Sequence, residues 1–204
     1  MTRPSALPEE RYAVGDGLAS HPVPPAGQFG CIYADPPWAM AMRSPKGEGR
    51  SAVRHYATMS LAEIKALPLA FTGAADCMLL MWVIDPMLPQ AMEVISAWGF
   101  TFKTVGFYWE KLNADGSPVM STGYWTRANP EQCWLATRGS PKRLARDVRR
   151  LIREPRREHS RKPERVYGDI ERLVSGPYLE LFARERRPGW TSWGDQLDRF
   201  EVAA

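Results

Sequence analysis

Short apolar runs alternate with segments of helical spacing along most of the chain, and this alternation constrains the fold more than any other feature. The runs are rich in β-branched and aromatic residues and predict buried strands; they cover residues 29–34, 77–84, 100–109, 132–137 and 178–183. The helical segments cover residues 60–67, 85–98 and 163–174. This order is typical of an α/β fold in which helices cover both faces of a mostly parallel sheet.

Local signals mark the ends of two predicted helices. Ser60 and Glu63 have the spacing of a capping box, which begins the first helix. Asp85 is predicted to cap the second helix, with Pro86 in its first turn and Gly99 as its stop.

The remaining segments predict loops or stay ambiguous. Residues 1–27 are rich in Pro, Gly, Ala and Ser and predict an extended lead-in, so that residues 28–204 form a single domain. Residues 39–55 and 113–129 predict long loops, the first with the character of a lid. The basic segment after residue 137 is ambiguous between helix and strand, and the tail from residue 184 predicts mostly loop.

Two charged residues directly follow predicted strands. Asp35 follows the run 29–34, and Arg184 follows the run 178–183. In open α/β sheets, ligands bind beyond the carboxyl ends of the strands. We therefore expect Asp35 and Arg184 to meet at one crevice, although they are far apart in the sequence.

Asp35 opens the motif Asp35-Pro36-Pro37-Trp38, whose residue types suit hydrogen-bond acceptance. Pro36 biases Asp35 away from helical backbone, and the two prolines fix their φ angles and remove two N–H donors. The Asp35 carboxylate and the backbone carbonyls then form a rigid acceptor surface, with a flat face of Trp38 beside it. The alternative is an ordinary Asp-Pro turn at the end of a strand.

Such an acceptor surface matches the exocyclic amino group of a base, which carries two N–H donors. One carboxylate and one carbonyl hold both donors and draw electron density onto a nitrogen that is otherwise a poor nucleophile. A free Asp has a pKa of about 3.9, which is too low to deprotonate that amine before it attacks. Asp35 is therefore expected to position the amine and to stabilise the positive charge that develops on it.

Positive charge is concentrated in one segment. Residues 138–165 contain twelve Lys or Arg and four Asp or Glu, a net charge of +8, whereas the whole chain carries +4. Such a stretch suits a polyanionic partner, and Arg149, Arg150 and Arg153 are candidates to contact phosphates. The alternative is a solvated charged face without a partner.

Several classes of protein are disfavoured. Cys31, Cys77 and Cys133 form no C-x-x-C pair and the three His are far apart, so we expect neither a zinc site nor a disulfide framework. No apolar run has the length of a membrane span and no signal peptide is evident, which favours a reducing, cytoplasmic setting. Neither a P-loop nor a G-x-G-x-x-G motif after a strand is present, which disfavours a simple nucleotide-binding module.

The motif at residues 35–38 resembles the catalytic signature of the MT-A family of adenine methyltransferases, named for the seventy-kilodalton subunit of the mRNA adenosine methyltransferase. Further blocks between residues 28 and 198 resemble the family in the same order. These blocks are Tyr56-Ala57-Thr58-Met59-Ser60, Trp98-Gly99-Phe100, Gly123-Tyr124-Trp125-Thr126-Arg127, His159-Ser160-Arg161-Lys162-Pro163, Glu180-Leu181-Phe182-Ala183-Arg184 and Gly189-Trp190 through Trp193-Gly194-Asp195-Gln196-Leu197. The resemblance implies a Rossmann-like methyltransferase fold in permuted order, with S-adenosylmethionine as cofactor.

The resemblance also implies site residues. Those implied for the cofactor are Lys162 for its methionyl carboxylate, Arg184 and Glu180 for its ribose, Asp195 and Gln196 for its ribose or adenine end, and Asp16 for its adenine. Tyr124, Trp125 and Arg127 are expected to shape the site of the target base or to contact the strand. Because an unpaired carboxylate is costly within an apolar run, Glu180 needs a partner or a ligand. The alternatives are a solvated charge for Lys162, turn residues at 195–196 and buried aromatic residues at 124–125.

The nature of the polymer stays open. A compact chain without a zinc finger or a separate RNA-binding domain resembles the prokaryotic or phage DNA-adenine type, so DNA is favoured over RNA as the partner. The other alternative is a non-catalytic, nucleic-acid-binding partner with a methyltransferase fold. The intact motif at Asp35 disfavours it, because degenerate partners of this family lose that signature. A homodimer or a heterodimer is compatible with the sequence.

Overall fold

The computed structural model describes residues 29–39, 58–69, 72–121, 123, 125–157 and 161–197. The predicted lead-in, Asp16, Tyr124 and most of the predicted lid loop lie outside these residues. Seven strands form one sheet in the order β5-β3-β4-β2-β1-β6-β7. The strands are β1 (Phe29–Ala34), β2 (Gly73–Val83), β3 (Thr101–Leu112), β4 (Glu131–Arg138), β5 (Leu151–Pro155), β6 (Tyr178–Leu181) and β7 (Trp190–Trp193).

The sheet is mostly parallel, as the sequence predicts. β1 pairs in parallel with β2 and β6, β6 pairs with β7, and β3 pairs with β5. Of the seven described strands, β4 alone runs against its neighbours, β2 and β3. The α/β fold class is therefore confirmed, with one reversed strand that the apolar pattern does not reveal.

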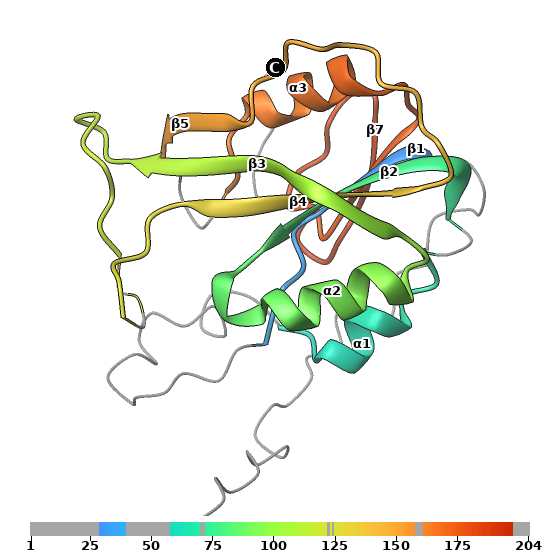
Figure 1. Cartoon of the computed structure of the whole chain (residues 1–204), viewed down its shortest axis with the longest axis horizontal. Coiled ribbons are helices and arrows are strands. Elements are labelled where there is room, and N and C mark those ends of the chain that lie inside the picture. Colours follow the sequence, from blue (N-terminus) through green and yellow to red (C-terminus); the bar gives the residue numbers. More distant parts are fainter. Residues whose placement is uncertain are drawn as a thin grey trace, which may run out of the picture.

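Helices cover both faces of the sheet. Figure 1 shows α1 (Leu61–Ala66) and α2 (Leu88–Ala97) together on one side and α3 (Arg165–Leu173) on the other. The capping box of α1 is confirmed, because Glu63 N donates to Ser60 Oγ and Ser60 N donates to the Glu63 carboxylate. The predicted cap of the second helix is wrong. A 3₁₀ turn (Asp85–Met87) precedes α2 without a side-chain cap, and Asp85 instead accepts a hydrogen bond from Gln132.

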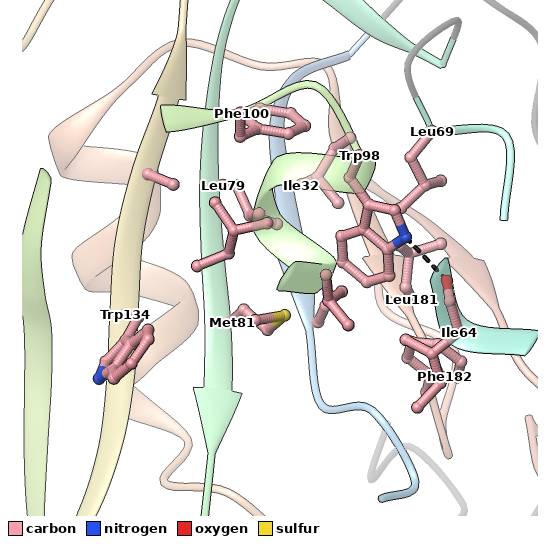
Figure 2. Packing of buried hydrophobic residues seen from close by; sticks show 14 of the residues in the cluster. Ile32, Ile64, Leu69, Leu79, Met81, Trp98, Phe100, Trp134, Leu181 and Phe182 are labelled. Atoms are coloured by element: carbon pink, nitrogen blue, oxygen red, sulfur yellow. Dashed lines mark hydrogen bonds between the residues drawn. The ribbon is translucent and has the colours of Figure 1, made fainter. Parts of the chain in front are cut away.

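The core between the sheet and α1 with α2 mixes aliphatic and aromatic side chains, and the Trp98 indole joins the two helices across it. Figure 2 shows Trp98 among Ile32, Leu69 and Leu181, with its Nε1 directed at the Ile64 carbonyl oxygen 2.8 Å away. Trp98 is fully buried, so this bond satisfies a donor that would otherwise be unpaired. The indole thereby joins α1 to the end of α2.

The core beneath α3 is aromatic. Tyr33, Trp82, Trp109, Tyr167 and Trp190 are all buried there. Edge-to-face contacts join Tyr33 to Tyr167 and to Trp190, and a hydrogen bond of 2.6 Å runs from Trp82 Nε1 to Tyr33 Oη. The Tyr33 hydroxyl and the Trp82 indole nitrogen lie near the edge of the sheet at which the parallel strands end, here called the carboxyl edge. The charged groups described below lie at the same edge.

Three elements differ from the sequence predictions. β7 lies in the tail predicted as loop, and β5 lies in the ambiguous basic segment. Both are short and border glycine or arginine, so their strand conformation depends on pairing with β6 and β3 rather than on local pattern. β2 begins four residues earlier than predicted, at Gly73, and this added part is exposed at Ala75 and Asp76.

Candidate active site

The topology brings four charged residues to one edge of the sheet. Asp35 follows β1, Arg184 follows β6 and Asp195 follows β7, and these parallel strands all end at the same edge. Because β4 is antiparallel, its first residue, Glu131, lies at that edge too. Burial raises the pKa of Asp35, and the charge of Arg184 opposes that rise in small part, in keeping with the predicted meeting of Asp35 and Arg184.

The Asp35-Pro36-Pro37-Trp38 motif forms a rigid turn beyond β1. Trp38 N donates to the Pro36 carbonyl at 2.8 Å, and Met59 N donates to the Pro37 carbonyl at 3.0 Å. The Trp38 indole nitrogen donates to the Trp82 carbonyl at 3.3 Å. These bonds fix the turn to β2 and to the segment before α1, so the Asp35 carboxylate is held at a defined position.

Two features of this turn differ from expectation. Trp38 is only 6% exposed and belongs to the core that packs against α1 and α2, so it presents no open face beside Asp35. The carbonyls of Pro36 and Pro37 already accept backbone hydrogen bonds. Each carbonyl oxygen has a second lone pair, so acceptance of a further donor requires that remaining pair.

Asp35 belongs to a chain of alternating charges. Lys162 Nζ lies 2.6 Å from Asp35 Oδ2 and 3.4 Å from Glu131 Oε2. Lys111 Nζ lies 2.7 Å from Glu131 Oε1. Lys162 also sits over the Trp82 ring, 5.3 Å from its centroid, which favours a cation at this position. The negative charges of two carboxylates and the positive charges of two ammonium groups thus cancel within a mostly buried site.

The two carboxylates respond oppositely to this environment. Burial raises the pKa of Asp35, and the charge and hydrogen bond of Lys162 only partly offset that effect. Burial would also raise the pKa of Glu131, but Lys162 and Lys111 together outweigh it and the pKa is lowered. Asp35 keeps 35% of its side-chain surface exposed, whereas Lys162 keeps 10%. Asp35 is therefore the member of the chain that an incoming ligand can reach.

Ion pairs on either side hold Lys162 in place. Arg161 pairs with Glu185, which is 6% exposed, and Glu164 pairs with Arg187 at 2.5 Å. Arg187 also lies over the Tyr167 ring at 3.7 Å from the centroid. The segment before α3 is thereby fastened to the chain that follows β6, with Lys162 between the two fastenings.

A second cluster lies where β6 and β7 end. Arg184 Nε donates to Gln196 Oε1 at 3.2 Å, and Asp195 beside them is exposed. Gly194 permits this arrangement, because a Cβ there would lie 2.3 Å from the Ala183 carbonyl oxygen. Phe182 adopts a left-handed φ of 61°, which redirects the chain just before Arg184.

Glu180 is buried on β6 and has a defined partner. Tyr167 Oη donates to Glu180 Oε1 at 2.8 Å. Burial raises the pKa of Glu180 to about 8, against the opposing effect of this hydrogen bond. Its other oxygen, Oε2, has no hydrogen-bond partner within the described residues, and neither has the buried Ser192 Oγ. Ser192 is the register partner of Glu180 on β7, so two unsatisfied polar atoms occur at neighbouring positions of the sheet.

The predicted substrate-side residues separate into two places. Trp125 is 90% exposed and Arg127 is exposed, both on the connection that joins β3 to β4 at the carboxyl edge. Arg150 instead donates to Thr104 Oγ1 near the start of β3, and Arg153 pairs with Glu110 at 2.6 Å. The basic residues are therefore not gathered around Asp35.

Sequence reasoning missed several site residues. Glu131, Lys111 and Trp82 were not predicted to take part, although they contact or neighbour Lys162. Glu131 lacks a sequence signal, because only the reversed direction of β4 brings it to this edge. Tyr167 on α3 was also missed, and an acid within an apolar strand is the one signal that called for such a partner.

Three further observations concern the described residues only. Within them, no group of three or more His, Cys, Asp or Glu side chains could hold a metal ion. No helix among them is both long and apolar enough to span a membrane. Cys31, Cys77 and Cys133 are free and buried.

Comparison with known proteins identifies relatives over most of the chain. A type II methyltransferase, M.MunI of Mycoplasma sp, is 32% identical over 191 residues, which cover 85% of this chain and 79% of that protein. The N(6)-adenosine-methyltransferase catalytic subunit METTL3 of Homo sapiens is 30% identical over 179 residues, covering 84% of this chain and 29% of the human protein. An N(6)-adenosine-methyltransferase MT-A70-like protein of Drosophila melanogaster is 31% identical over 179 residues, which cover 84% of this chain and 27% of the fly protein. The chain thus spans under a third of the length of these two eukaryotic relatives.

The family model MT-A70 matches residues 29–196, which include every described strand and helix. The match contains the turn at Asp35, the Lys162 segment and the β6–β7 cluster. We conclude that the chain belongs to the MT-A70 family of S-adenosylmethionine-dependent methyltransferases.

Proposed function

We propose that this methyltransferase modifies the exocyclic amino group, N6, of adenine in DNA. The observation that carries the proposal is the Asp35 carboxylate, held by a rigid turn at the carboxyl edge and partly exposed within a chain of buried charges. A carboxylate in this position accepts a hydrogen bond from an amino group and opposes the positive charge that grows on its nitrogen.

Asp35 must be ionised to act in this way. Its pKa is raised by burial, and Lys162 counters that effect, so Lys162 helps to keep the carboxylate charged. Asp35 Oδ2 is occupied by Lys162, which leaves Oδ1 to receive one amino hydrogen. The second lone pair of the Pro36 carbonyl is the proposed acceptor for the other hydrogen. The amine proton leaves during or after methyl transfer, and no covalent enzyme intermediate is needed.

The residues present fit S-adenosylmethionine, which supplies a methyl group on a sulfonium centre when bound. Lys162 is the proposed partner of its carboxylate, because a cation already shared between two acids can exchange one of them for a third. Arg184, Gln196 and Asp195 are the proposed contacts for the ribose and the adenine end. The unsatisfied Oε2 of Glu180 is a polar atom that suits a hydroxyl-bearing ligand. Asp16 stays a proposed contact outside the described residues.

The connection between β3 and β4 supports a nucleic-acid substrate. Its base is fixed by reciprocal hydrogen bonds between Lys111 and Asn129, and Lys111 belongs to the charge chain of the site. Trp125 projects from this connection with 90% of its surface exposed, beside the exposed Arg127. An exposed indole next to a cation suits stacking on a base, as in enzymes that extract the target nucleotide from the helix. Tyr124 is proposed to act with them.

DNA is preferred over RNA because a relative that this chain covers over 79% of its length is named a type II methyltransferase. RNA adenosine is the second candidate substrate. It is supported by relatives named N(6)-adenosine-methyltransferases, of whose length this chain covers less than a third. A non-catalytic role is disfavoured, because Asp35 and its supporting turn are complete.

The test is to incubate the purified protein with labelled S-adenosylmethionine and, separately, duplex DNA, single-stranded DNA and RNA, and to identify the labelled nucleoside after digestion. We expect N6-methyladenine in DNA, and we expect Asp35→Ala to abolish it while the fold and cofactor binding persist. Asp85→Asn is the matched control, because Asp85 follows β2 much as Asp35 follows β1 but accepts a hydrogen bond from Gln132 and has no ion pair within the described residues. Equal rates for Asp35→Ala and the parent would overturn the assignment of Asp35, and label in another nucleoside would overturn the proposed substrate.

A further inference from the structure

The connection between β4 and β5, residues 139–150, forms a strap across the α3 side of the molecule. Figure 1 shows it arching over α3 from the end of β4 to β5. Backbone hydrogen bonds join Leu144 N to the Leu173 carbonyl and Ala145 N to the Arg172 carbonyl at 2.9 and 3.1 Å. At its far end the Arg150 carbonyl accepts from Tyr108 N at 2.9 Å. The strap is therefore an anchored surface even though it contains no helix or strand.

The cations of the strap are unusual in lacking acidic partners. Asp147, its single acidic residue, is neutralised by two hydrogen bonds from Arg172. Five exposed cations on the strap and just after β5 have neither an ion pair nor a side-chain hydrogen bond within the described part of the chain. They are Lys142, Arg143, Arg146, Arg149 and Arg156. By contrast, Arg150 and Arg153 already bond to Thr104 and Glu110.

Four of these five cations lie away from the reactive edge, because the connection 139–150 runs from the end of the antiparallel β4 to the start of β5, whereas Arg156 follows β5 at the carboxyl edge. β5 is separated from β1 by β3, β4 and β2, which at about 4.8 Å per strand spacing places it roughly 19 Å from β1 along the sheet. Yet the same segment leads back to the site. Arg156 N donates to the Leu112 carbonyl at the end of β3, and Lys162 follows a few residues later. The strap and the site are thus two ends of one basic stretch of chain.

We infer that the strap is a phosphate-binding surface that anchors the nucleic acid at a point several nucleotides away from the target adenine. The inference rests on the proposed function for the identity of the polymer. As phosphate contacts it assigns the five unpaired cations, in place of the predicted Arg150 and Arg153. A duplex rises about 3.4 Å per base pair, so the roughly 19 Å between β1 and β5 across the sheet alone corresponds to five or six base pairs. Contacts at that distance position the polymer without reading its sequence.

The test measures binding of a fluorescein-labelled DNA duplex of about 40 base pairs and mixed sequence across a series of salt concentrations, without cofactor. Arg143→Gln and Arg146→Gln are each expected to reduce the salt slope by about 0.9, and the double variant by about twice that. Lys65→Gln is the matched control, because it also removes one exposed cation but lies on α1, paired with Glu93 on the opposite face of the sheet. It is expected to leave the slope unchanged.

A second measurement separates anchoring from catalysis. With sheared DNA as substrate, the double variant is expected to raise KM by roughly fivefold or more while kcat is retained. An unchanged salt slope, or an equal fall in the Lys65→Gln variant, would overturn the strap as a binding surface. Because binding is measured without methyl transfer, a protein that bound DNA through the strap but methylated no adenine would overturn the proposed function alone.

Discussion

Lys162 Nζ lies 2.6 Å from Asp35 Oδ2, so the cation proposed to hold the cofactor carboxylate is already bound to the acid proposed to hold the target amine. The same cation lies 3.4 Å from Glu131. Two carboxylates therefore share one ammonium group, which carries three N–H donors. Arrival of the cofactor carboxylate adds a competitor for Lys162, and the ionisation of Asp35 depends on how far that cation moves.

Replacing Lys162 is expected to shift the acidic limb of the activity profile. Lys162 lowers the pKa of Asp35 against the dominant effect of burial, so Lys162→Gln raises that pKa further. The ionised carboxylate is then lost at a higher pH as the solution is acidified. We expect the kcat profile to fall off at higher pH than in the parent, together with weaker binding of S-adenosylmethionine by calorimetry. A limb at the parental position would contradict the coupling of these two residues.

Replacing Glu131 is expected to shift the same limb in the other direction. The negative charge of Glu131 raises the pKa of Asp35, so Glu131→Gln lowers it and keeps Asp35 ionised at lower pH. Glu110→Gln is the control, because Glu110 on β3 pairs with Arg153 on β5 and forms no ion pair with Lys162 among the described residues. The opposite signs for the Lys162 and Glu131 variants distinguish an electrostatic effect from general damage to the site. Shifts of the same sign would overturn the charge chain described here.

Glu180 is expected to make stability depend on pH. Its pKa of about 8 in the folded protein lies above its ordinary value of 4.5, so between these values the folded state keeps a proton that the unfolded chain releases. The free energy of unfolding contributed by this group is therefore highest at low pH and declines as the pH rises towards 8. Glu180→Gln keeps an acceptor for Tyr167 but removes the titration. Urea unfolding from pH 5 to 8 is expected to show the variant gaining on the parent by up to about 1.4 kcal/mol per pH unit.

Gly194 is expected to tolerate no side chain. A Cβ at this position would meet the Ala183 carbonyl oxygen at 2.3 Å, which forces the ends of β6 and β7 apart. Gly194→Ala should lower the free energy of unfolding by roughly 1–3 kcal/mol and weaken cofactor binding through Gln196. Gly168→Ala is the control, because a Cβ there meets nothing within 4 Å and helix α3 favours Ala. A Gly194→Ala variant as stable as the parent would contradict the close approach.

Most strands, and helices on both faces of the sheet, were predictable from the sequence, because buried strands and amphipathic helices leave apolar patterns in it. β1 has the predicted bounds, and α1 has its predicted capping box. The pattern could not give the direction of β4, since an antiparallel strand buried on both faces has the same composition as a parallel one. That direction decides which end of β4 enters the site, and Glu131 was missed for this reason.

Candidate site residues were predicted where local chemistry constrains them. Asp35 and Arg184 follow strands, and their shared edge is a consequence of topology. The partners of Lys162 and Glu180 were not predictable, because their distances depend on packing between segments far apart in the chain. The burial of Trp38 shows the same limit, since a residue beside a site can face the core.

Trp38 and Trp125 are expected to separate stability from substrate binding. Trp38 is 6% exposed and donates to the Trp82 carbonyl, so Trp38→Phe should lower the free energy of unfolding by roughly 1–3 kcal/mol through a lost hydrogen bond and a small cavity. Its KM for DNA should stay near the parental value, because the ring offers no open face. Trp125 is 90% exposed, so Trp125→Ala should leave unfolding unchanged but raise the KM for DNA, in keeping with about 1–3 kcal/mol of lost stacking. If Trp38→Phe raised KM at unchanged stability, the indole would have to leave the core to meet the base, and the anchoring role derived from its hydrogen bond would be wrong.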